Sequence, residues 1–172
     1  WKVYYDDVNG GILPTRLVED SRQLERDWID KEGVYVKRPK EEMEKLGMKA
    51  IPLLWIDTNK GDSQNIFVRS RLVVREATKR GIHDKLAPEK LFSAMPSLES
   101  LKLLCSLQST LQQSKKGKPL KIAFWDISRA HFMSDVKRTI YVQLPEGDPD
   151  RETHVGLLKR TMYGARDASN FW

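Results

Sequence analysis

The sequence has only one cysteine, Cys105, among its 172 residues. One cysteine excludes an internal disulfide framework and fits a reducing compartment. No apolar run approaches the ~20 residues that a membrane-spanning helix needs, and residues 1–7 do not have the pattern of a signal peptide. We therefore expect an intracellular protein that is not secreted and has no membrane partner.

Histidine is also scarce. His83, His131 and His154 are scattered along the chain, and there is no Cys-x-x-Cys pair. The sequence therefore indicates no histidine–cysteine metal site.

The residues that are present predict a folded, basic domain. Hydrophobic residues make up 40% and charged residues 31% of the chain, which is typical of globular proteins. Residues 1–50 carry 10 Lys/Arg and 11 Asp/Glu, whereas residues 51–172 carry 20 and 13. The positive charge is thus concentrated in the second part, which favours a polyanionic partner, although solvated basic faces are common.

A short apolar run at residues 120–125 predicts a buried strand that leads directly into Asp126. An ionised carboxylate at the end of such a strand needs a cation or hydrogen bonds. Magnesium-binding acids of nucleotide-transferring enzymes meet that requirement. The alternative is an aspartate that caps a turn. Residues 139–144 predict a second strand.

Alternation between residues 66 and 75 predicts a strand with two different faces. Arg69, Arg71 and Arg75 fall on one face, and apolar side chains on the other. We expect this strand to pair with residues 51–57 through the turn-like residues 58–62. The arginine face could bind phosphate through bidentate hydrogen bonds, or it could simply be solvated.

Three helices and one further strand are also predicted. Apolar spacing indicates a helix over residues 15–30, and residues 33–37 form a strand candidate. A polar helix over 41–46 ends at Gly47. Ser97 is a good N-cap for a helix that extends to about residue 113. We expect that helix to turn an apolar stripe toward the core, made of Leu98, Leu101, Leu104, Cys105, Leu107 and Leu111.

Six blocks in one order carry a family resemblance. They are WIDTNKGD (55–62), RSRLVVRE (69–76), FSAMPSLESLKLL (92–104), FWDISRAHF (124–132), IYVQLPEG (140–147) and LLKRTMYGARDASNFW (157–172). In order and spacing the chain resembles the N-terminal half of copia-type (Pseudoviridae-like) retrotransposon reverse transcriptases. The resemblance is weakest over the first 50 residues.

The resemblance implies a role for individual residues. Asp126 would be a catalytic acid that holds Mg²⁺ together with the backbone carbonyl of Ile127. Nucleotide-binding positions would be Lys60, Arg69, Arg71, His131, Tyr163, Gly164 and Arg166. Nucleic-acid-binding positions would be Arg75, Lys79 and Arg80. The implied partners are an RNA template, a DNA primer and a deoxynucleotide triphosphate.

Some features depart from the family pattern. His131 stands where copia-type enzymes usually have an aromatic residue beneath the sugar, and Asp167 and Ser169 replace the usual glutamine and proline. Residues 4–7, Tyr-Tyr-Asp-Asp, look like the second catalytic acid box, but they precede Asp126 instead of following it. We interpret them as an accidental match. We also expect the chain to be a fragment that ends before the true box and is inactive alone.

The sequence as a whole predicts an α+β fold: part of the fingers and palm of a reverse transcriptase with an N-terminal helical extension. Residues 1–50 would form the extension and residues 51–172 the partial fingers and palm, together as one folded unit. The expected function is that of a fragment of an RNA-directed DNA polymerase from the polyprotein of a transposable element. The alternatives are a non-catalytic nucleic-acid-binding remnant and an unrelated basic scaffold for an acidic protein.

Overall fold

The computed structural model describes residues 2–76, 96–166 and 168, without the side chain of His131. The fold is mixed α+β, as predicted, and every named strand pair is antiparallel. The helices are α1 (Thr15–Lys31), α2 (Lys40–Lys45), α3 (Leu98–Leu111) and the 3-10 turn η2 (Ala130–Met133). The strands are β1 (Tyr4–Tyr5), β2 (Ile12–Leu13), β3 (Tyr35–Pro39), β4 (Leu53–Asn59), β5 (Val68–Val74), β6 (Tyr141–Gln143) and β7 (His154–Leu158).

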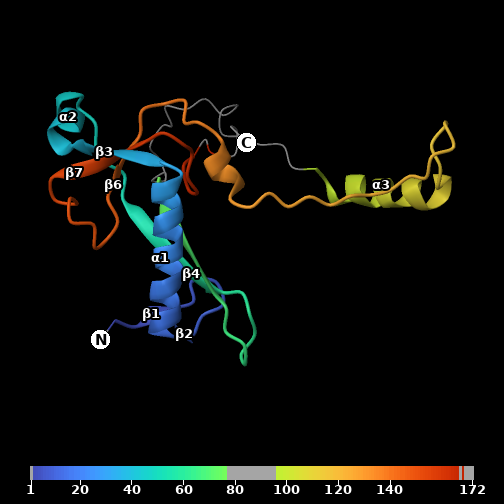
Figure 1. The fold of residues 1–172 in the computed structure, drawn as a ribbon, viewed down its shortest axis with the longest axis horizontal. Helices are drawn as coiled ribbons and strands as arrows, with labels where there is room; N and C mark the ends of the chain where they lie inside the picture. Colours follow the sequence, from blue (N-terminus) through green and yellow to red (C-terminus); the bar gives the residue numbers. More distant parts are fainter. Residues whose placement is uncertain (1, 77–95, 167, 169–172) are drawn as a thin grey trace, which may run out of the picture.

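The strands form three small sheets around one long helix. They are the hairpin β1-β2, the hairpin β4-β5 and the three-stranded sheet β3-β7-β6. In Figure 1, α1 crosses in front of the β4-β5 hairpin, with β1 and β2 at its N-terminal end and the three-stranded sheet near its C-terminal end. The helix thus connects elements from both ends of the chain.

The main core is built from residues far apart in the sequence. Ile29 of α1 and Val34 pack with Leu72 of β5, and the same cluster contains Val142 of β6 and Leu158 of β7. Phe132 lies among them with its ring 4.8 Å from Trp28 and 5.1 Å from Tyr163, measured between ring centroids. An isolated two-stranded hairpin is only marginally stable, so the β4-β5 hairpin depends on the apolar burial that it shares with α1 and the three-stranded sheet.

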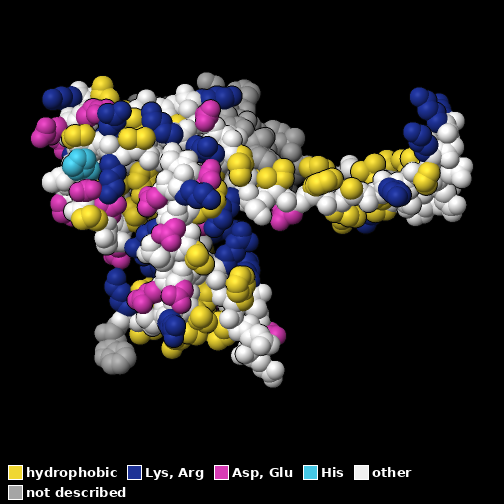
Figure 2. Space-filling model, viewed as in Figure 1, with side chains coloured by type: hydrophobic (Ala, Val, Ile, Leu, Met, Phe, Trp, Pro, Cys, Tyr) yellow, Lys and Arg dark blue, Asp and Glu magenta, His cyan; other side chains and the backbone are white. Residues whose placement is uncertain are grey.

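Helix α3 forms where the sequence predicts it, but it is not in the core. The Oγ atom of Ser97 accepts a hydrogen bond from the Ser100 N–H at 3.3 Å, which confirms the predicted N-cap. The predicted burial is wrong, because no α3 residue is buried and Leu104 is 59% exposed. Figure 1 shows α3 extending away from the rest of the chain, and Figure 2 shows hydrophobic side chains along it.

The predicted buried strand at residues 120–125 is also absent. Phe124 and Trp125 are 77% and 89% exposed, and the segment has no regular secondary structure. The Leu120 N–H donates to the Gln112 carbonyl at 2.8 Å, so the chain runs back along α3 instead of joining a sheet. A strand requires a neighbouring strand as hydrogen-bonding partner, and none pairs with this segment within the described ranges. None of the described helices has the length and apolarity to cross a membrane.

Candidate functional site

The β4-β5 hairpin confirms the predicted pairing and its two faces. Arg71 lies opposite Ile56 in the antiparallel register, and Arg69 lies opposite Thr58. Val68, Ser70, Leu72 and Val74 are buried, whereas Arg69 and Arg75 are exposed and Arg71 is half-buried. The alternation in the sequence therefore placed the arginines on the open face of the hairpin.

The loop between the two strands is longer than predicted and is held by its own polar groups. It covers residues 60–67, and the Oδ1 atom of Asn59 accepts hydrogen bonds from the N–H groups of Gly61 and Phe67, both at 2.9 Å. Asp62 accepts from the N–H groups of Gln64 and Asn65, which holds its pKa below the usual value. Lys60 lies in this loop.

A cavity of about 700 Å³ lies between α1, β5 and the segment that follows α3. Five predicted site residues line it: Arg69, Arg71, Asp126, Ile127 and Tyr163. Basic side chains are gathered beside α1 on the side that faces the projecting α3 segment (Figure 2). The structure thus brings together residues that are up to 94 positions apart, counted from Arg69 to Tyr163.

Other predicted site residues do not line this cavity. They are Lys60, Arg75, Gly164 and Arg166. Lys79, Arg80 and Asp167 lie outside the described residues, and so does the side chain of His131. A second cavity of about 650 Å³, next to α2 and β7, contains none of the predicted site residues.

Arg71 lines the cavity and has one buried donor without a partner among the described residues. Its guanidinium carbon lies 5.2 Å from the centroid of the Tyr163 ring, in cation–π geometry. Its Nε atom is buried and has no hydrogen-bond partner among the described residues. An unsatisfied buried donor costs about 1–3 kcal/mol, so an anion that accepted this hydrogen bond would be stabilised at the same place.

Asp126 and Ile127 form the opposite wall and are both exposed. Two residues later, Arg129 adopts a left-handed conformation with φ of 54°. Its Nε and Nη2 atoms donate to Oε2 of Glu25 on α1 at 3.3 and 3.1 Å. The carboxylate of Asp126 and the carbonyl of Ile127 could each contribute one oxygen to a divalent cation.

These two oxygens do not complete a two-ion centre, which requires carboxylates that bridge the ions. Asp20 and Glu25 also line the cavity, but the Asp20 carboxylate lies 3.9 Å from Arg16 and that of Glu25 is paired with Arg129. Across residues 2–76, 96–166 and 168, no cluster of three or more His, Cys, Asp or Glu side chains could hold a metal. The donor set therefore does not fit the pair of Mg²⁺ ions that the resemblance implies.

The Tyr163-Gly164 turn is fixed to the end of β5. The Val74 N–H donates to the Tyr163 carbonyl at 2.7 Å. Gly164 has φ of +81°, and a Cβ atom there would overlap the Val74 carbonyl oxygen. Any side chain at position 164 would push the turn away from β5. The Arg166 N–H donates to Glu76 at 3.0 Å, and this second hydrogen bond also joins the turn to the residues that follow β5.

The acids in the Tyr-Tyr-Asp-Asp sequence have structural roles. Oδ1 of Asp6 accepts hydrogen bonds from the N–H groups of Val8 and Asn9, both at 2.9 Å, and its Oδ2 accepts from the Asn59 N–H at 3.0 Å. Oδ2 of Asp7 accepts from the Asp57 N–H at 2.7 Å. These carboxylates join the β1-β2 turn to β4, which agrees with reading the motif as an accidental match.

Sequence reasoning missed the contribution of α1. The helix residues Leu17, Asp20, Ser21, Leu24 and Glu25 form one wall of the cavity, and none of them is a predicted site residue. Glu25 is only 4% exposed. Val18, seven residues before Glu25, and Ile29, four residues after it, lie on the same buried face of the helix, and this spacing was the available signal of a buried acid.

The family model described as "Reverse transcriptase (RNA-dependent DNA polymerase)" matches residues 31–172, which is most of the chain. No curated protein and no solved structure gives a match. The chain therefore belongs to the reverse transcriptase (RNA-dependent DNA polymerase) family.

Proposed function

We propose that the chain is a fragment of the RNA-directed DNA polymerase of a copia-type retrotransposon, comprising part of its fingers and palm. Six ordered blocks of the sequence support the copia-type assignment. Residues 1–50 and 51–172 act as one folded unit, which is supported by the contact of Ile29 and Val34 with Leu72 in the main core. We expect an intracellular location, in the nucleus or a cytoplasmic particle.

The cavity next to β5 binds the phosphates of an incoming deoxynucleotide. The observation that carries this proposal is the side chain of Arg71, which lines that cavity and whose buried Nε atom has no hydrogen-bond partner among the described residues. Arg69 is the exposed neighbour on the same strand face and adds a second positive charge. Guanidinium groups bind phosphate through two parallel hydrogen bonds, so this pair suits a triphosphate.

The remaining predicted residues extend the same surface. Arg75, with Lys79 and Arg80 beyond the described part, would bind the nucleic-acid backbone, and Lys60 would contact phosphate from the hairpin loop. Tyr163 positions the Arg71 guanidinium, and Gly164 lets the turn lie against β5. Arg166 and His131 remain proposed nucleotide contacts. The partners are an RNA template, a DNA primer and a deoxynucleotide triphosphate.

Members of the family typically use Mg²⁺, and Asp126 with the Ile127 carbonyl are the residues we propose as its ligands. Because the described donors are too few for two ions, we derive no catalytic step from them. The second candidate function is a non-catalytic nucleic-acid-binding remnant of such a domain, which is supported by Asp167 and Ser169 in place of the usual glutamine and proline. Nucleotide binding that strengthens with Mg²⁺ would separate the polymerase fragment from the remnant.

The salt dependence of nucleic-acid binding tests the shared part of both functions. The affinity for an RNA–DNA hybrid should fall steeply with salt, with a log–log slope of about −0.7 to −0.9 for each phosphate neutralised. Replacing Arg69, Arg71 and Arg75 together with Gln should flatten the slope by about two to three units.

A matched control is the triple replacement of Arg16, Arg38 and Arg151 with Gln. It removes the same charge, but none of these residues lines the cavity, so its slope should stay close to that of the unmodified chain. A slope near zero in the unmodified chain, or equal flattening by both triple variants, would reject the proposed function.

A further inference from the structure

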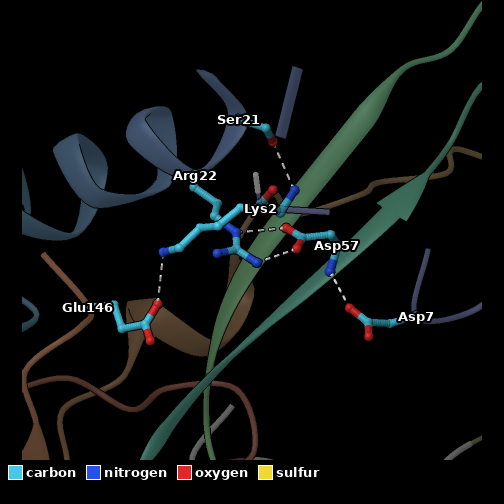
Figure 3. A network of polar contacts seen from close by, with 7 residues as sticks. Lys2, Asp7, Ser21, Arg22, Asp57 and Glu146 are labelled. Atoms are coloured by element: carbon cyan, nitrogen blue, oxygen red, sulfur yellow. Dashed lines mark hydrogen bonds and ion pairs between the residues drawn. The ribbon is translucent and has the colours of Figure 1, made fainter. Parts of the chain in front are cut away.

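Helix α1 forms one wall of the cavity and contacts the other two, although residues 1–30 lie outside the range that matches the family model. On one side it is attached to the β4-β5 hairpin, as Figure 3 shows. The Nη2 and Nε atoms of Arg22 donate to the two carboxylate oxygens of Asp57 at 2.5 and 3.2 Å. The Oγ atom of Ser21 accepts a hydrogen bond from the Ser70 N–H at 2.9 Å.

Three hydrogen bonds therefore attach α1 to the β4-β5 hairpin. The side chain of Asp57 is 4% exposed and that of Arg22 is 14% exposed, and the Arg22 guanidinium also lies over the Tyr4 and Trp55 rings. A two-pronged guanidinium–carboxylate pair of this kind fixes orientation as well as distance. The wall that carries Arg69 and Arg71 thus keeps one position relative to the helix.

A second ion pair joins α1 to the segment that carries Asp126. Glu25 lies one helical turn after Arg22, and its side chain is 6% exposed where it pairs with Arg129. The Arg129 guanidinium also lies over the Trp28 ring, 4.7 Å from its centroid. Asp126 and Ile127 are exposed, so Arg129 is the nearest residue after them that is fixed to the helix.

We propose that Glu25 is a positioning residue: through Arg129 it holds the segment that carries Asp126 opposite the arginine face of β5. Glu25 touches neither the nucleotide nor a metal in this proposal. Its importance for nucleotide binding rests on the proposed function, but the positioning itself does not.

Distance measurements between two spin labels test the positioning directly. In a Cys105→Ser background, labels at Arg16→Cys and Ser128→Cys join α1 to the Asp126 segment. Residue 16 lies about 13 Å from Glu25 along the helix, so the label is well removed from the ion pair. The distance distribution should be narrow with Glu25 present and should broaden in the Glu25→Gln variant.

Three controls make the result specific. Asp20→Asn changes an exposed acid on α1 that also lines the cavity, and it should leave the distribution narrow. The double variant Glu25→Arg with Arg129→Glu reverses the pair and should restore the narrow distribution. Labels at positions 16 and 38, both within the folded body, should give the same distribution with or without Glu25.

An unchanged 16–128 distribution in Glu25→Gln would overturn the proposal, as would equal broadening of the 16–38 distribution. If Glu25→Gln does not fold, a broad 16–128 distribution in the reversed pair would overturn it instead. The measurement needs no nucleotide or nucleic acid. A failed salt titration together with a positive distance result would therefore reject the nucleotide role and keep the positioning role.

Discussion

The carboxylate of Asp6 is buried and accepts hydrogen bonds on both of its oxygens. It is 5% exposed, and its oxygens accept hydrogen bonds from backbone N–H groups of its own turn and of β4. These hydrogen bonds, first of all the one from Asn9, hold the pKa of Asp6 well below its usual 3.8. The charged form is therefore the one that stabilises the fold.

This pKa gives a stability that depends on pH in a defined direction. Because the pKa of Asp6 is lower in the folded state, its contribution is complete above about pH 4 and is lost as pH falls toward the folded pKa. Asp6→Asn should destabilise the protein in urea at pH 6, and the difference from the unmodified protein should shrink at pH 3. Asp20→Asn, at an exposed site, should show no such convergence. A difference for Asp6→Asn that stays constant between pH 6 and pH 3 would contradict the assignment.

At the scale of elements, the sequence predicted correctly those features that depend on residues close together in the chain. The Ser97 cap, the alternation in β5 and the apolar spacing of α1 each depend on neighbouring residues, and all three elements formed as predicted. Burial depends on partners far away in the chain, and there prediction failed for α3 and for residues 120–125. The candidate site shows the same contrast between local and distant residues. The arginine face of β5 was predictable from local alternation, whereas the partners in the Glu25–Arg129 pair are 104 residues apart and no local pattern links them.

Two substitutions test this contrast between helix formation and burial. Leu104 is 59% exposed, so Leu104→Asp should change the free energy of unfolding by less than about 1 kcal/mol. Phe132 is fully buried between Trp28 and Tyr163, so Phe132→Ala should cost about 3–5 kcal/mol. Urea unfolding at neutral pH measures both. A larger loss from Leu104→Asp than from Phe132→Ala would show that α3 is packed against the core.

At the scale of the whole molecule, α1 and the main core join the N-terminal residues to the part that matches the reverse transcriptase family. The cavity depends on this arrangement because its walls come from α1, from β5 and from the segment after α3. The arginine face of the hairpin lines it from β5, and Asp126 lines it from the segment after α3. Binding of a triphosphate at the arginine face is the central claim.

The measurement that tests this claim most directly is a titration of the arginine Nε–H groups with deoxythymidine triphosphate, followed in ¹H–¹⁵N spectra. The Nε resonance of Arg71, assigned by its absence in Arg71→Gln, should shift until the site saturates, while that of Arg38 should not. Arg71→Gln should weaken binding about tenfold or more, because a charged hydrogen-bond donor contributes about 1.5–3 kcal/mol. An Arg71 resonance that does not move at saturation, or one that moves no more than that of Arg38, would contradict the account.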